Sequence, residues 1–204
     1  MSFLFYLSKI IKLSRLPAIK NSVIESTSKI CSATYLVDST IGRYSYVGHD
    51  CTIINTDVGS FCSIADNVIV GGASHAVDWV TTSPVFNKGK NVLRKNFAQH
   101  EYTTSLKTTI GSDVWIGNNV LIKSGVHVGH GSVVGMGAVV TKDIPPYEIW
   151  AGNPAKFIRK RFDQEKIDVL LSKHWWDASE NDLVRLANHI DDPDKFISVL
   201  SEIF

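Results

Sequence analysis

Histidine is the residue type in this chain best suited to acid–base chemistry near neutral pH, because an imidazole has a pKa of about 6.5. Of the seven histidines, His75 stands where a regular repeat gives way to a long irregular segment, which begins Ser74-His75-Ala76-Val77-Asp78-Trp79. Irregular segments of such length are usually functional or disordered. A histidine placed there could remove the proton from a hydroxyl as its oxygen attacks an acyl group. Asp78 could orient the imidazole or bind the acceptor, or simply cap the loop.

The three cysteines suggest no covalent chemistry. Their number is odd and their spacing matches no metal-binding pattern, so neither a disulfide framework nor a metal site is expected. Cys51 and Cys62 occupy the small inward position of the repeat described next. We therefore expect them to fill the core rather than to act as reactive thiols.

A six-residue period determines how the chemistry must be positioned. Aliphatic residues recur without a slip over the second half of the chain, at Ile110, Ile116, Ile122, Val128, Val134 and Val140. The first half shows the same period at Ile24, Ile30, Leu36, Ile41, Val47, Ile53, Val58, Ile64 and Val70, with two five-residue steps. A glycine follows the aliphatic residue at 111, 117, 129 and 135.

A period of six fits neither a helix nor an isolated strand. It fits short extended segments joined by sharp corners, where glycine tolerates unusual backbone angles. Three such segments bring the chain back to its starting edge, and the coils stack into a prism with inner apolar columns. The fold class predicted is therefore mainly β, a parallel β-helix with one long loop and a C-terminal helical segment.

Three regions depart from the repeat. Residues 1–20 hold four cations and no acid, and their apolar residues fall on one helical face. This basic amphipathic segment would pack on its own domain or a neighbouring subunit, or lie at an anionic membrane surface. Within the β-helix domain of residues 21–160, residues 71–109 form the loop. Residues 161–204 read as helical, with Ser179 as a cap, and a helix over the last coil would cover its open edge.

Composition narrows the class of protein. With 21 Lys+Arg against 20 Asp+Glu the formal charge is +1, so nucleic acid is not an expected partner. No apolar run approaches the roughly 20 residues that cross a bilayer. We expect a soluble protein of a reducing compartment, the cytoplasm. A location at the inner membrane surface is the alternative.

The hexads resemble the left-handed parallel β-helix of the hexapeptide-repeat acyltransferases. Several blocks in the right order resemble the xenobiotic acetyltransferase branch, which acetylates chloramphenicol or streptogramin hydroxyls. These blocks are Gly42-Arg43-Tyr44-Ser45-Tyr46, residues 59–64, 75–86, 110–117 and 152–161, and Trp175-Trp176-Asp177. In the antibiotic enzymes a long insertion after the first block helps build the drug pocket. Here Val47–Asp57 continues the repeat instead, so a different acceptor pocket is expected.

The resemblance implies a reaction and a site. His75 would be the general base for direct attack of a hydroxyl on acetyl-CoA, without an acyl-enzyme, and Asp78 and Trp79 lie beside it. Closed trimers with sites between subunits are implied, and no metal. The residues that would line the cofactor wall are Trp115, Asn118, Met136, Thr141, Lys142, Lys156 and Arg159.

Three functions follow from these observations. The leading one is O-acetylation of a carbohydrate, such as a sugar of a surface polysaccharide. Acetylation of an antibiotic hydroxyl is the alternative enzymatic function, and an amino-sugar could serve the same base as an acceptor. A catalytically silent β-helix that serves as a binding scaffold is the third, and it predicts no acetyl-CoA binding.

Overall fold

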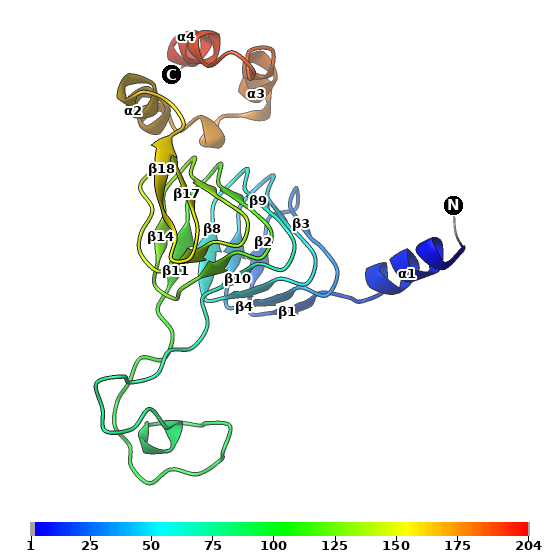
Figure 1. The fold of residues 1–204 in the computed structure, drawn as a ribbon. Helices are drawn as coiled ribbons and strands as arrows, with labels where there is room; N and C mark the ends of the chain where they lie inside the picture. The colour runs from blue at the N-terminus through cyan, green and yellow to red at the C-terminus, as the bar shows by residue number, and fades with distance from the viewer. Residues whose placement is uncertain (1–2, 204) are drawn as a thin grey trace.

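The computed structural model describes residues 3–203. Its strands are two to five residues long and form three sheets, which together make a triangular prism (Figure 1). As far as β16, successive strands lie in successive sheets, so that every third strand returns to the same sheet. The pairing between coils is parallel, as in the β-helix that the period of six predicts.

The three sheets, A, B and C, have the following strands. Sheet A contains β1 (Ala18–Lys20), β4 (Tyr35–Val37), β7 (Thr52–Ile54), β10 (Ile69–Val70), β13 (Leu121–Ile122) and β16 (Val139–Val140). Sheet B contains β2 (Val23–Ile24), β5 (Thr40–Ile41), β8 (Thr56–Val58), β11 (Thr108–Ile110) and β14 (His127–Val128). Sheet C contains β3 (Lys29–Ile30), β6 (Tyr46–Val47), β9 (Ser63–Ile64), β12 (Trp115–Ile116), β15 (Val133–Val134), β17 (Glu148–Ala151) and the antiparallel β18 (Lys156–Lys160).

The aliphatic residues of the repeat form the inner columns, as predicted. In sheet A, for example, Leu36, Ile53 and Val70 are in register on consecutive coils and fully buried. Cys51 and Cys62 are also buried in this core. Burial raises the pKa of the Cys62 thiol to about 12 and raises that of Cys51, so both stay protonated and act as core residues.

The corners correct the expected role of glycine. Gly117, which follows an aliphatic residue, does not have a positive φ; a Cβ there would lie 2.6 Å from the Met136 nitrogen of the next coil. The left-handed conformation comes two residues later, at Asn119 (φ 60°), where asparagine tolerates it. Glycine after the aliphatic position therefore allows close stacking of coils. The left-handed turn comes two residues later, where Asn119 makes it in one coil and Gly131 and Gly137 make it in others.

The A–B corner, between the end of each sheet A strand and the next sheet B strand, is where the repeat is irregular. Both five-residue steps cross it, from Leu36 to Ile41 and from Ile53 to Val58. After β10 the chain leaves the prism at this corner and returns at β11. We call residues 71–107 the excursion loop; its one helical element is the 3₁₀ turn η1 (Pro84–Phe86).

The C-terminal helices do not cover the last coil, contrary to expectation. They are α2 (Gln164–Lys173), the 3₁₀ turn η2 (Trp175–Asp177), α3 (Glu180–Ala187) and α4 (Pro193–Ile203). They pack on the B–C corner, where the Phe61 and Trp175 ring centroids are 5.0 Å apart and Arg43 donates to the Trp176 carbonyl at 2.7 Å. Strand β18 pairs with β17 and covers the open edge itself. Ser179 caps α3, as predicted.

Helix α1 (Phe3–Leu13) projects from the prism at its N-terminal end (Figure 1). The first coil begins at β1, so residues 18–20 belong to the prism rather than to the N-terminal segment. Within residues 3–203 no helix has the length and apolar character needed to span a bilayer.

Candidate active site

The excursion loop is closed at its base by backbone hydrogen bonds. The Gly71 N–H donates to the Ile122 carbonyl, and the Thr108 N–H donates to the Asn55 carbonyl, both at 3.0 Å. One turn into the loop, the Ser74 N–H donates to the Thr104 carbonyl at 2.6 Å and joins the outgoing and returning chains. His75 follows directly, so its backbone is held where the loop leaves the prism.

The His75 ring is oriented by a carbonyl. Its Nδ1 lies 2.8 Å from the Thr82 carbonyl oxygen. Because a carbonyl can only accept, Nδ1 carries the hydrogen and donates it, and the neutral ring keeps its free electron pair on Nε2. The side chain is exposed. His75 therefore presents a proton acceptor to any molecule bound beside the loop.

The other expected residues of the loop lie differently. Trp79 packs edge-on against His100 and Tyr102, at centroid distances of 5.5 and 5.7 Å, and thereby holds together the two halves of the loop. Asp78 is exposed, and the hydrogen bond of His75 goes to Thr82 rather than to Asp78. Thr82 could not be predicted, because it acts through its backbone carbonyl, which every residue type has.

Part of the expected cofactor wall comes together on sheet C and at the C–A corner. This corner lies between the end of each sheet C strand and the next sheet A strand. Trp115 and Arg159 belong to one outward row of sheet C. In this row Trp115 pairs with residue 133, residue 133 pairs with residue 149, and residue 149 pairs with Arg159. Asn118 and Met136 are neighbours at the C–A corner, where the Gly137 N–H donates to the Asn118 carbonyl at 2.8 Å. Lys156 pairs with Ala151 at the start of β18. All five predicted side chains are exposed.

The remaining two predicted residues lie elsewhere. Thr141 and Lys142 follow β16 at the A–B corner, the corner from which the excursion loop leaves. Sheet A therefore separates His75, Thr141 and Lys142 from the wall at the C–A corner. One chain places the two sets of predicted residues on opposite edges of one sheet.

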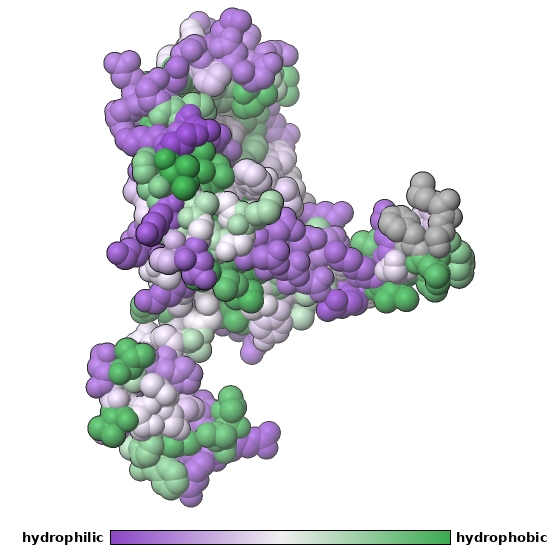
Figure 2. Space-filling model, in the orientation of Figure 1, coloured by the Kyte–Doolittle hydropathy of each residue, from purple (hydrophilic) through white to green (hydrophobic). Residues whose placement is uncertain are grey.

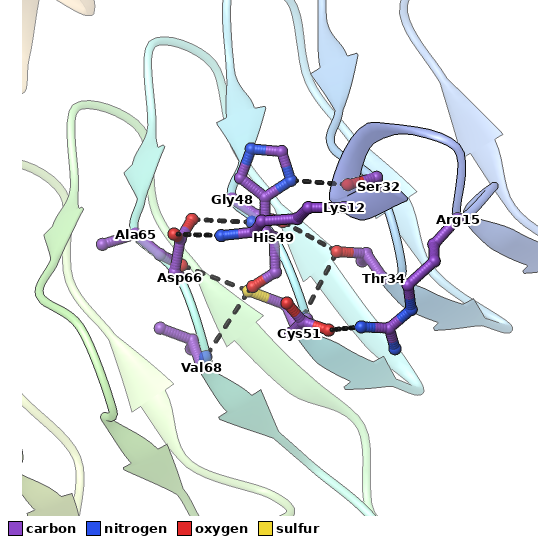
Figure 3. A network of polar contacts seen from close by, with 11 residues as sticks. Lys12, Arg15, Ser32, Thr34, Gly48, His49, Cys51, Ala65, Asp66 and Val68 are labelled. Carbon is purple, nitrogen blue, oxygen red and sulfur yellow. Dashed lines mark hydrogen bonds and ion pairs between the residues drawn. The ribbon is translucent and has the colours of Figure 1, made fainter. Parts of the chain in front are cut away.

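Below Asn118, the C–A corner continues as a polar column (Figure 3). The Asn119 N–H donates to the Asp66 carbonyl at 3.1 Å, and an Asp66 carboxylate oxygen accepts the His49 N–H at 2.7 Å. The His49 Nδ1 lies 2.7 Å from the Ser32 hydroxyl. This column extends the predicted cofactor wall toward the N-terminal coils with groups that form hydrogen bonds.

His130 has a structural role at the B–C corner. Its ring stacks on Trp176 at 4.5 Å, and its Nδ1 accepts the Ser112 N–H at 2.9 Å. Burial, and then the neighbouring His174 and His127, lower the pKa of His130. A neutral ring that accepts from the backbone suits attachment of the C-terminal helices rather than catalysis. In the described part of the chain, no three His, Cys, Asp or Glu side chains are grouped to hold a metal ion.

Comparison with known proteins identifies the family. Residues 107–142 match the model described as bacterial transferase hexapeptide (six repeats). A chloramphenicol acetyltransferase of Escherichia coli is 40% identical over 159 residues, which cover 67% of this chain and 74% of that enzyme. The chain belongs to the hexapeptide-repeat acetyltransferases. As a member of this family it is an enzyme, and the scaffold interpretation is set aside.

Other hexapeptide-repeat acetyltransferases similar to this one are named for sugar acceptors. The galactoside O-acetyltransferase of Escherichia coli K12 is 40% identical over 126 residues, 62% of this chain and 56% of that protein. The crystal structure of the polySia specific acetyltransferase NeuO superposes with a TM-score of 0.51 at 31% identity. The superposition covers 70% of this chain and 65% of that one.

Proposed function

We propose that this acetyltransferase moves the acetyl group of acetyl-CoA to a hydroxyl of a carbohydrate, such as a sugar of a surface polysaccharide. The hydrogen bond from His75 Nδ1 to the Thr82 carbonyl carries the catalytic part of the proposal, because it leaves Nε2 free to act as the base. Acetyl-CoA as the donor is supported by exposed cations near both halves of the site, Lys142, Lys156 and Arg159, which suit its phosphates.

The reaction proceeds in two proton transfers around one addition. His75 Nε2 accepts the hydroxyl proton as the oxygen attacks the thioester carbonyl carbon. The tetrahedral oxyanion collapses, the carbon–sulfur bond breaks, and the imidazolium returns the proton to the CoA thiolate. Cys51 and Cys62 offer no competing covalent route, because both are buried and burial raises the pKa of each thiol.

A carbohydrate acceptor is supported by the regular path of the chain after Tyr46. Strands β6, β7 and β8 follow one another through plain corners, so no segment protrudes there to enclose an apolar drug. Along the C–A corner, the exposed Asn118 and the partly exposed His49 and Asp66 are polar side chains that can form hydrogen bonds, as hydroxyl-rich ligands require. Two similar proteins are named for sugar acceptors.

A second candidate, O-acetylation of an antibiotic, is favoured by the 40% identity to a chloramphenicol acetyltransferase. A thiol-release assay separates the two, with sugars, nucleotide-sugars, oligosaccharides, chloramphenicol and virginiamycin as acceptors. We expect turnover with a carbohydrate at a kcat/KM at least 100-fold above that for either antibiotic. Turnover with an antibiotic alone would overturn the carbohydrate assignment and keep the acetyl transfer.

The assembly we propose is a homotrimer, because the two halves of the site lie on opposite edges of sheet A and a closed ring of copies brings them together. Sedimentation velocity at micromolar concentration should give three times the chain mass of 22.6 kDa. A species of one chain mass that still turns over acetyl-CoA would contradict the shared site.

A further inference from the structure

Helix α1 is fixed to the prism by its cationic side. Lys12 Nζ lies 3.6 Å from an Asp66 carboxylate oxygen, and Arg15 Nη1 lies 2.8 Å from one of Asp50. The Arg15 carbonyl accepts the Ala33 N–H at 2.8 Å, so the chain after the helix is tied to the same place. Figure 3 shows both cations reaching the C–A corner. The end of α1 is therefore attached beside the polar column that continues the cofactor wall.

The apolar side of α1 points the other way. At 100° per residue, Phe3, Leu7, Ile10 and Ile11 fall within an arc of about 100°, roughly opposite to Lys12. Their exposed fractions are 77%, 40%, 63% and 58%. Figure 2 shows hydrophobic side chains gathered on this projecting part. Packing of the apolar face on its own prism, one of the alternatives left by the sequence, is thus not what the structure shows.

Sheet A carries a matching apolar row on its outer face. Tyr35, Ile69 and Leu121 lie in one row on this face, with Thr52 between Tyr35 and Ile69. The three apolar side chains are 47%, 46% and 42% exposed. The α1 of the same chain leaves the row exposed. Each copy therefore presents one apolar helix face and one apolar row that lie on different parts of its surface, as a head-to-tail contact in a ring requires.

Anionic lipid suits the face less well. Attraction to a bilayer would come from the cations of residues 1–20, which are Lys9, Lys12, Arg15 and Lys20. Two of these, Lys12 and Arg15, form ion pairs with aspartates of the same chain, on the side of the segment away from the apolar face. Half of the cations that would hold a lipid surface are thus directed at the protein.

We propose that the apolar face of α1 of one copy docks on the outer row of sheet A of the next copy. This contact would bring the C–A corner of the first copy, with Asn118 and Met136, against sheet A of the second copy. The His75 loop of that second copy leaves from the A–B corner, at the other edge of the same sheet. The helix would thereby act as a clasp that holds the two halves of the site in register. This role rests on the active site shared between copies that is proposed above. The docking itself requires no particular acceptor.

The clasp is tested through assembly rather than turnover. The triple variant Leu7→Gln, Ile10→Gln and Ile11→Gln keeps good helix formers but removes the apolar face. We expect it to raise the concentration at which the assembly dissociates, measured by sedimentation velocity, by at least tenfold. The matched control Lys9→Gln, on the polar side of α1, should leave it unchanged. Equal assembly of the triple variant and the wild type would overturn the proposal.

The partner surface is tested by the same measurement. The pair Tyr35→Gln and Leu121→Gln should produce a similar shift, and combining it with the α1 variant should add little, because both remove one contact. Fully additive shifts would show two unrelated surfaces and overturn the docking. Should the variants fold poorly by circular dichroism, an Ile10→Cys, Leu121→Cys chain decides instead: a reducible covalent link between copies supports the clasp, and its absence contradicts it.

A vesicle-binding experiment tests the other possible occupant of the apolar face, an anionic membrane. Wild-type protein mixed with phosphatidylserine-containing vesicles should stay in the supernatant. Co-sedimentation that the Leu7, Ile10 and Ile11 variant abolishes would assign the face to membrane and overturn the clasp. Loss of assembly in the variants together with no acetyl transfer to any carbohydrate would leave the clasp standing while the proposed acceptor fails.

Discussion

The prism and the excursion loop differ in what holds their side chains in place. In the prism, Ile116 is fully buried and its position follows from register with the coils on either side. In the loop, Val80 is fully exposed, and His75 is oriented by a single hydrogen bond to a carbonyl seven residues away. The stacked coils thus hold their side chains by packing, whereas the interruption of the repeat presents the exposed imidazole that we propose as the base.

The largest effect is expected from His75→Ala. If the loop carries the chemistry, turnover should fall by ~10²–10⁴-fold, because no base remains to accept the hydroxyl proton. The KM for acetyl-CoA should stay near the wild-type value, since the proposed partner of His75 is the acceptor hydroxyl and not the phosphates of the donor. Steady-state thiol release measures both parameters. His127→Ala, an exposed histidine of the coils, is the matched control, and near-normal turnover of His75→Ala would remove the residue from the mechanism.

The stability side of the comparison is tested by two truncations. Ile116→Ala should lower the free energy of unfolding by about 2–5 kcal/mol, because it leaves a cavity between coils. Val80→Ala should change it by less than about 0.5 kcal/mol, because no packing is lost. Urea unfolding of both variants gives the values. Similar losses for the two would mean that the loop is as much a part of the core as the coils.

Much of the prism could be predicted, since the aliphatic period fixes which residue points inward whatever the rest of the chain does. The corners could not, because Gly117 serves coil stacking and Asn119 makes the turn. Nor could the place of the C-terminal helices, which depends on aromatic rings such as Phe61 that only the folded corner brings together. In the site, the position of His75 could be predicted but its Thr82 partner could not.

A smaller effect is expected from the cations of the coils. The double variant Lys142→Ala and Arg159→Ala should raise the KM for acetyl-CoA about tenfold and leave kcat nearly unchanged, because charge-assisted contacts to phosphate are lost from ground and transition state alike. Arg185→Ala with Lys195→Ala removes two exposed cations from the C-terminal helices and should change neither parameter. An unchanged KM in the first variant would exclude its two cations from the donor site.

The smallest effect concerns pH and the B–C corner. Because burial lowers the pKa of His130, the unfolded chain takes up the proton first as the pH falls. The contribution of the neutral His130 ring to the free energy of unfolding is complete above about pH 6.5. It is lost as the pH drops through the lowered pKa that this ring has in the folded protein. It is limited to about 1.4 kcal/mol per pH unit and is smaller for a partly exposed ring.

This slope can be assigned with a variant. His130→Gln keeps a polar side chain but cannot titrate, so its free energy of unfolding should fall less between pH 6.5 and 5 than that of the wild type. Asp177, His174 and His127 are the charged or ionisable neighbours of this ring, and they remain in place. Identical pH profiles for the two proteins would assign the slope to those neighbours instead.

The most direct test of the account mixes two inactive chains. His75→Ala removes the base, and Asn118→Trp fills the C–A corner; each homogeneous protein should transfer acetyl at least ~10²-fold more slowly than the wild type. Co-expressed and purified as mixed trimers, they should recover about a third of wild-type activity, since one of the three interfaces in each mixed ring would join an intact loop to an intact wall. Mixed assemblies verified by native mass spectrometry that remain inactive would show that a single chain holds the whole site, and would contradict an active site shared between copies.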